Sequence, residues 1–176
     1  EYSHKLKGAF NIKDDNKIIY SGQPRNDLFF NYDKEKIRKL KYKYFHSEDK
    51  FIITYMPTFR DNKNQVFSFL NLSQDQKSSL NKIIDSNIII VEKAHFVDLE
   101  MRSKDIDVKS NSPNIIKCPD DIDAQELLLI SDILITDYSS CYIDYLTLNR
   151  PIIHYLYDYN FYKNEDRGLY YDIGDV

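Results

Sequence analysis

Residues 123–156 read DAQELLLISDILITDYSSCYIDYLTLNRPIIHYL. Two short apolar runs of strand length, 133–136 and 151–156, are separated by residues 139–148, whose apolar positions recur at helical spacing. Residues 123–130 are predicted to form a further helix before the first of these strands. Strands with near-continuous apolar runs, alternating with helices, are typical of a parallel sheet that is covered on both faces.

The same alternation extends toward the N-terminus. Further strands are predicted at residues 51–56, 88–91 and 114–118, and further helices at residues 33–44 and 73–84. Ser73 and Asp123 are suitable N-cap residues. We therefore expect an α/β fold, a Rossmann-like parallel sheet with helices on both faces. Residues 1–30 differ, because they show no clean period beyond a short predicted strand at 17–20 and a turn at 21–27.

The composition excludes several classes of protein. The 176 residues are 42% hydrophobic and 30% charged, which argues against disorder, and the net charge of −4 argues against a broad basic surface for duplex nucleic acid. No apolar run approaches the roughly 18 residues that span a bilayer, and no signal peptide opens the chain. Cys118 and Cys141 form neither a disulfide framework nor a metal motif, which favours a reducing compartment.

Polar clusters follow three of the predicted strands, where parallel sheets bind ligands. They are residues 56–61, 92–95 and 136–140. In the third cluster, Ser139 and Ser140 open a helix after Thr136 and Asp137, which is an arrangement that can hold a phosphate. The alternative is that Ser139 only caps its helix. The chain contains no GxGxxG, Walker or GxSxG sequence.

Three other side chains are ambiguous. Arg60 can clamp a pyrophosphate with its planar guanidinium, or it can form a surface pair with Asp61. His95 can bind a phosphate or act as an acid, or it can be structural. His154, in the middle of a predicted strand, is interpreted as a core residue or as a support to the site. No group of histidines and carboxylates has the spacing of metal ligands, so no protein-held metal is expected.

Taken together, these motifs resemble the CDP-glycerol glycerophosphotransferases, the teichoic acid primases and polymerases. The most specific segment is LLISDILITDYSS at residues 128–140. Weaker matches are GQPRND at 22–27, YMPTFRD at 55–61, Asp144-Tyr145, RPII at 150–153, Tyr157-Asp158 and RGLY at 167–170. The chain departs from the family at His95-Phe96, where the family has His-Pro.

The resemblance implies the carboxyl-terminal, donor-binding half of a two-domain enzyme of the GT-B type. Residues 1–30 are then a connector from a missing N-terminal acceptor domain, and residues 31–176 are a CDP-polyol-binding domain that is truncated at its C-terminus. Such enzymes transfer glycerol phosphate from CDP-glycerol to a hydroxyl acceptor in teichoic acid or capsular polymer synthesis and release CMP, and they use no cofactor. They work as peripheral proteins on the cytoplasmic face of the bacterial membrane, and we expect the isolated chain to be inactive.

The resemblance also assigns the site. Arg25, Arg60 and the loop at 136–140 are expected to surround the donor's phosphates, with His95 as the catalytic residue and Asp144 on the ribose hydroxyls. Two alternatives stay open: a nucleotide-sugar glycosyltransferase or UDP-sugar epimerase-like domain, and a non-catalytic nucleotide-binding module.

Overall fold

The architecture is a five-stranded parallel sheet between two layers of helices. The computed structural model describes residues 2–61, 66–93, 112–166 and 168–169. The strand order is β3-β2-β1-β4-β5, and each neighbouring pair is parallel. The strands are β1 (Phe51–Met56), β2 (Ile88–Glu92), β3 (Ile115–Lys117), β4 (Ile133–Thr136) and β5 (Ile152–His154). The predicted α/β class is confirmed.

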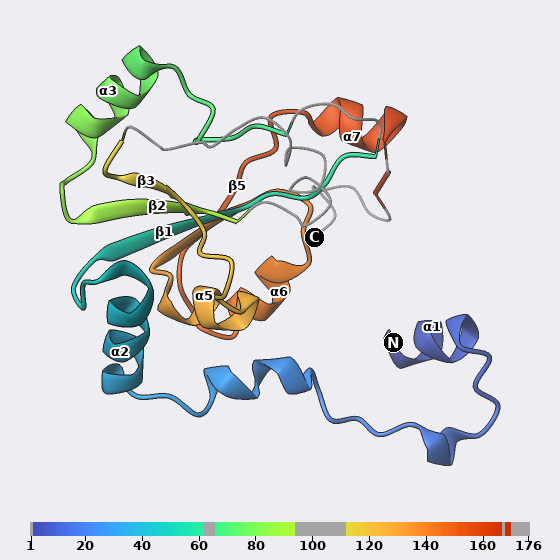
Figure 1. Cartoon of the computed structure of the whole chain (residues 1–176). Helices are drawn as coiled ribbons and strands as arrows, with labels where there is room; N and C mark the ends of the chain where they lie inside the picture. Colours follow the sequence, from blue (N-terminus) through green and yellow to red (C-terminus); the bar gives the residue numbers. More distant parts are fainter. Residues whose placement is uncertain (1, 62–65, 94–111, 167, 170–176) are drawn as a thin grey trace.

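The helices follow the alternation seen in the sequence. They are α1 (Tyr2–Ala9), α2 (Lys34–Phe45), α3 (Gln74–Ile83), α5 (Ala124–Ile130), α6 (Cys141–Leu146) and α7 (Tyr159–Glu165), with 3-10 helices η1 (Asp15–Lys17) and η2 (Pro24–Phe29). Figure 1 shows α2, α5 and α6 on one side of the sheet and α3 and α7 on the other. Both predicted caps are confirmed: Ser73 accepts from the Gln76 N–H and Asp123 from the Gln125 N–H. No helix within these described ranges is long and apolar enough to cross a membrane.

Two local predictions are wrong. Residues 17–20 do not form a strand, because η1 ends at Lys17 and Ile19, 85% exposed, has no neighbouring strand among the described residues. Figure 1 shows this N-terminal segment running beyond the sheet. The helix predicted at 139–148 is shorter, since α6 begins only at Cys141. The turn predicted around Pro24 is present as η2, with Pro24 at its first position and Gly22 before it at φ +75°.

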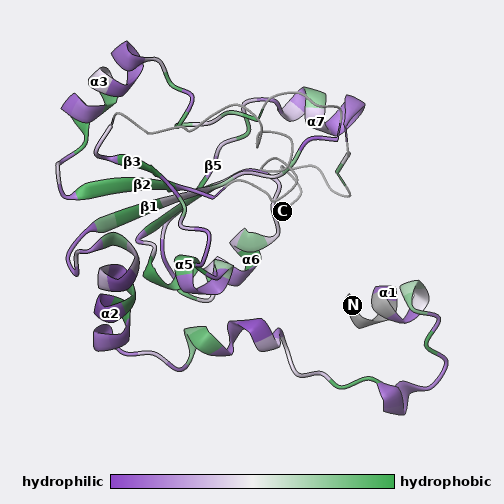
Figure 2. Cartoon of the chain, viewed as in Figure 1, coloured by the Kyte–Doolittle hydropathy of each residue, from purple (hydrophilic) through white to green (hydrophobic). Residues whose placement is uncertain are grey.

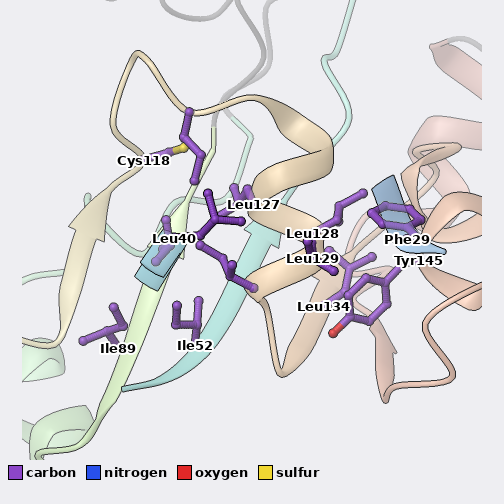
Figure 3. Packing of buried hydrophobic residues seen from close by; sticks show 13 residues of the cluster. Phe29, Leu40, Ile52, Ile89, Cys118, Leu127, Leu128, Leu129, Leu134 and Tyr145 are labelled. Atoms are coloured by element: carbon purple, nitrogen blue, oxygen red, sulfur yellow. The ribbon is translucent and has the colours of Figure 1, made fainter. Parts of the chain in front are cut away.

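The core lies between the sheet and α5. Four consecutive apolar side chains, Leu127 to Ile130, are almost fully buried. Four consecutive apolar residues cover every side of a helical turn, so that turn must be enclosed, and α5 does pack against β1, α2 and η2. Figure 3 shows these leucines with Phe29 from η2 and Tyr145 from α6. Figure 2 shows the resulting pattern, with an apolar sheet and polar outer helices.

Replacing Leu134 by alanine is expected to destabilise the fold by about 2–5 kcal/mol, because this β4 side chain is fully buried and its loss leaves a cavity. Urea unfolding followed by circular dichroism measures the change. Leu146→Ala is the matched control, since the same atoms are removed from a side chain that is 59% exposed. The control should cost no more than about 0.5 kcal/mol, and equal losses in both variants would contradict this description of the core.

Candidate functional site

The carboxyl ends of three strands lie level with one another. Met56 of β1 is the Cα partner of Thr136 of β4, which in turn is the partner of His154 of β5. The strand order also reverses between β1 and β4, since the chain continues from β1 to β2 on one side and returns to β4 on the other. Open parallel sheets bind ligands at such a switch point, beyond the carboxyl ends of the strands. The loops that follow these three strands therefore form the candidate site.

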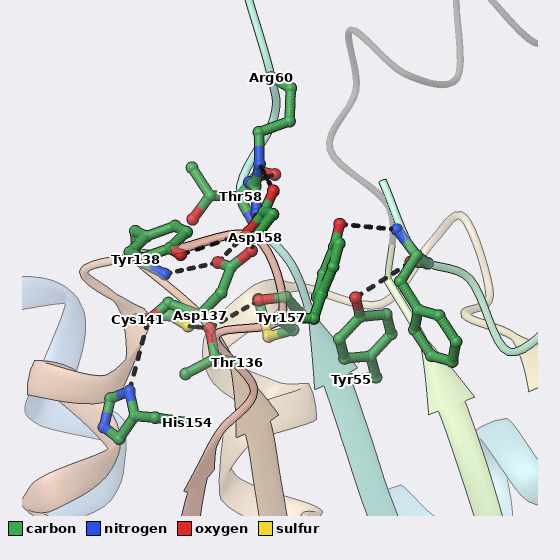
Figure 4. A network of polar contacts seen from close by, with 12 residues as sticks. Tyr55, Thr58, Arg60, Thr136, Asp137, Tyr138, Cys141, His154, Tyr157 and Asp158 are labelled. Carbon is green, nitrogen blue, oxygen red and sulfur yellow. Dashed lines mark hydrogen bonds and ion pairs between the residues drawn. The ribbon is translucent and has the colours of Figure 1, made fainter. Parts of the chain in front are cut away.

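A buried ion-pair network ties the three loops together (Figure 4). Arg60, only 2% exposed, donates from Nη2 to Asp137 Oδ2 over 2.9 Å and from Nε to Asp158 Oδ2 over 2.8 Å. It also donates from Nη2 to Asp158 Oδ1 and from Nη1 to the Thr58 carbonyl. Asp137 Oδ1 accepts from the backbone N–H groups of Thr58 and Tyr138, over 2.8 and 2.6 Å. One guanidinium thus joins the loops after β1, β4 and β5.

Aromatic rings enclose this network. Tyr138 stacks on Tyr162 of α7 with ring centroids 3.8 Å apart and planes 13° from parallel. The Arg60 guanidinium carbon lies 5.2 Å from the centroid of Tyr138 and 4.8 Å from that of Tyr162. The Tyr138 hydroxyl donates to Asp158, and burial together with this carboxylate raises the pKa of Tyr138. The phenol therefore stays protonated as a donor.

The charge of Arg60 is held by its carboxylate partners. Burial alone lowers the pKa of the guanidinium, but the hydrogen bonds that it donates to Asp158 and Asp137 outweigh burial and raise the pKa above its ordinary value. The alternative of a surface pair between Arg60 and Asp61 is wrong, because Arg60 is buried and its carboxylate partners lie on other loops. Four guanidinium N–H bonds are accounted for by protein acceptors. This geometry favours a role for Arg60 in holding the loops.

Thr136 and the two serines face different surroundings. The buried Thr136 hydroxyl donates to the Met56 carbonyl over 2.7 Å, so it joins the ends of β4 and β1. Ser140 occupies the N-cap position of α6 but makes no side-chain cap, and its side chain is exposed. The Ser139 Oγ, half-buried, accepts from the Cys141 N–H over 3.4 Å, which is a long bond. The cap interpretation thus fits Ser139 weakly and does not fit Ser140.

The structure brings together two predicted residues that are far apart in the sequence. Arg25 of η2 donates from Nε to Asp144 Oδ2 of α6 over 2.9 Å and from Nη2 to Oδ1 over 3.3 Å. The Asp144 carboxylate is buried, whereas the Arg25 side chain is 51% exposed. A phosphate contact for Arg25 and a ribose contact for Asp144 were expected separately, but the two side chains are partners.

The histidines and the polar cluster at residues 92–95 add little to the described site. His95 lies outside the described residues. His154 ends β5 with an exposed side chain, so its interpretation as a core residue is wrong, although Nδ1 lies 3.3 Å from the Asp137 carbonyl oxygen. Glu92, in the second cluster, is buried and accepts from the Ser68 hydroxyl over 2.6 Å and from the Leu70 N–H. Among the described residues, no group of three or more His, Cys, Asp or Glu side chains can hold a metal.

Sequence reasoning missed Asp158 as a site residue. The sequence does contain a signal for it, because Asp158 follows the last predicted strand, as Asp137 follows the one before. Its pairing with Arg60 over 98 positions depends on the sheet order, which no local pattern specifies.

Arg60→Lys is expected to lower the free energy of unfolding by about 1.5–3 kcal/mol, because an ammonium cannot span both carboxylates in the plane of the guanidinium. Urea unfolding measures the loss. Arg38→Lys, at an exposed position of α2, provides the control with the same chemical change and should be nearly neutral. If both variants are as stable as the parent, the buried network does not hold the loops.

Comparison with known proteins places the chain in a family. The family model described as CDP-Glycerol:Poly(glycerophosphate) glycerophosphotransferase matches residues 1–176. The teichoic acid poly(glycerol phosphate) polymerase of Bacillus spizizenii is 37% identical over 97% of this chain and 43% of its own length. The teichoic acid glycerol-phosphate transferase of Staphylococcus aureus is 34% identical over 95% of this chain and 42% of its own length.

The solved structures agree. The wall teichoic acid polymerase TagF superposes on 99% of this chain with a TM-score of 0.75 and 29% identity, over 42% of the polymerase chain. A variant of TagF soaked with CDPG superposes with a TM-score of 0.73. The chain therefore spans less than half the length of the relatives that it matches, and it belongs to the CDP-glycerol:poly(glycerophosphate) glycerophosphotransferase family.

Proposed function

We propose that this chain is the donor-binding part of a glycerophosphotransferase that acts in teichoic acid or related polymer synthesis. The donor is CDP-glycerol or a related CDP-polyol. An acceptor hydroxyl attacks the β-phosphorus and gives its proton to a base in the remainder of such an enzyme. The bond from that phosphorus to the bridging oxygen breaks, and CMP leaves with the electron pair of that bond. Because this chain spans about 43% of a curated relative, we assign the acceptor site to the remainder of such an enzyme.

One observation carries the proposal. At the switch point of the sheet, the loop after β4 presents the Ser140 hydroxyl to solvent, with the half-buried Ser139 beside it. The half-exposed guanidinium of Arg25 is bound to α6, which follows directly. Hydroxyl donors and a guanidinium suit an anion such as a diphosphate. The match of the whole chain to the glycerophosphotransferase family specifies which diphosphate to test first.

The protein's contribution to such a reaction is electrostatic. Phosphoryl transfer develops charge on the phosphate oxygens, and donors that are already in place stabilise that charge without rearranging. The network of Arg60, Asp137 and Asp158 holds the three loops in place, so the hydrogen-bonding groups on these loops keep their positions. Direct contact of Arg60 with the donor stays a prediction, as does the catalytic role of His95.

The chain is expected to bind CDP-glycerol in isothermal titration calorimetry more tightly than it binds UDP-sugars or CMP. UDP-sugar preference would instead favour a glycosyltransferase or epimerase. Binding of all cytidine nucleotides alike, with no turnover when an acceptor domain of a relative is supplied, would favour a non-catalytic module.

Replacing Ser139 and Ser140 together by alanine is expected to weaken CDP-glycerol binding at least tenfold, since each hydrogen bond to a charged group contributes about 1.5–3 kcal/mol. The matched control is the double change of Ser78 and Ser79 to alanine, an exposed adjacent pair on α3, which should leave affinity unchanged. Thermal melting of both variants separates capping from binding. A Ser139/Ser140 variant that melts earlier but binds as tightly as the parent would leave Ser139 a cap and nothing more.

A further inference from the structure

Three side chains from two elements, η2 and α5, converge on the carboxylate of Asp144. Besides Arg25, Asn26 of η2 donates from Nδ2 to Oδ1 over 2.8 Å, and Gln125 of α5 donates from Nε2 to Oδ2 over 3.4 Å. The Asp144 side chain is 5% exposed. A ribose hydroxyl would have to reach a carboxylate that is already enclosed by these donors. The geometry therefore argues against the direct sugar contact that the family resemblance implies.

The two side chains of the Arg25–Asp144 pair differ in their exposure to solvent. The carboxylate is buried, while the Arg25 side chain remains 51% exposed. Asp144 takes the edge of the guanidinium that carries Nε and Nη2. The other edge, between Nη1 and Nη2, keeps two parallel N–H bonds that match two oxygens of a phosphate. The pair thus presents a positive edge outward.

The pair also lies next to the serine loop. Asp144 is four residues after Ser140, and residues four apart on a helix are neighbours on one face, with Cβ atoms about 5–6 Å apart. Arg25 is therefore bound to a residue that lies one helical turn from the exposed Ser140. An anion held by the loop after β4 would meet both.

Asn26 shows that this cluster is not built for stability alone. Its side chain is buried, and Oδ1 has no hydrogen-bond partner among the residues that the structure describes. A flipped amide would set its oxygen against the Asp144 carboxylate, so Asp144 fixes the orientation that leaves Oδ1 unsatisfied. A buried unsatisfied oxygen costs folding free energy, and such costs persist mainly at functional sites.

We propose that Asp144, supported by Asn26 and Gln125, is a positioning residue that holds the Arg25 guanidinium for a phosphate of the donor. The inference rests on the proposed function, because it takes the donor to be a diphosphate. Fixing the long side chain in advance removes the loss of rotamer freedom that a free arginine would undergo on binding. Asp144 then acts on affinity only through Arg25.

A double-mutant cycle tests the inference with two probes, CDP-glycerol and inorganic diphosphate. Asp144→Asn is expected to weaken binding of both probes about tenfold, and Arg25→Ala at least as much. The double variant should bind no more weakly than Arg25→Ala alone, since Asp144 has nothing left to hold. Asp132→Asn is the control for lost stability, because that carboxylate also accepts two hydrogen bonds, from Lys41 and the Ile52 N–H, but lies away from Arg25.

Each other outcome has a distinct meaning. If Asp144→Asn weakens CDP-glycerol but not diphosphate, Asp144 contacts the nucleoside and the inference is overturned. Equal losses in the parent and in the Arg25→Ala background would show a merely structural role, which also overturns it. Binding of diphosphate without any binding of CDP-glycerol would overturn the proposed function, but the double-mutant cycle could still be measured with diphosphate. Binding of neither probe would overturn both the proposed function and this inference.

A milder variant covers the case in which Asp144→Asn does not fold, as judged by circular dichroism. Asn26→Ala removes one donor to Asp144 and keeps the carboxylate. It should weaken diphosphate binding several-fold in the parent and not at all in the Arg25→Ala background. An equal effect in both backgrounds again contradicts positioning through Arg25.

Discussion

The guanidinium of Arg60 is the constraint on which the candidate site depends. Three loops meet at the carboxyl edge of the sheet, and each supplies an acceptor to this one side chain: Thr58, Asp137 and Asp158. A buried charge is tolerated only when it is paired and hydrogen-bonded. The loops therefore cannot separate without leaving charges unpaired. This network thus fixes the position of the loop after β4, which carries Ser139 and Ser140.

Much of the fold was predictable because its signals are local. Each strand is an apolar run, and the caps Ser73 and Asp123 begin their helices where residue type predicts. The short strand expected at 17–20 fails for a non-local reason: apolar residues form a strand only when a neighbouring strand accepts their hydrogen bonds. The length of α6 also could not be read from spacing, since Ser139 and Ser140 belong to the loop although they fit the helical period.

The sequence predicted which residues lie at the candidate site better than it predicted what each of them does. Placing polar residues after strand ends identified Arg60, Asp137 and the serines, because parallel strands end at one edge. It could not show that Arg60 is enclosed by two carboxylates or that Asp144 is paired with Arg25, 119 positions away. Partners are decided by the strand order and by how η2 packs on α5. The position of a charged residue after a strand predicts where it lies, but its role depends on which side chains surround it in the fold.

The central strand pair has a consequence for how the chain folds. β1 lies between β2, its next strand in the chain, and β4, whose residues follow about 80 positions later, as in the pairing of Ile53 with Ile133. Until β4 arrives, β1 is an open sheet edge with unpaired backbone groups, and closing so long a loop is slow. Partly folded chains thus expose an apolar edge that can pair with another copy. During synthesis, residues 51–56 must wait for residues 133–136 before the sheet is complete.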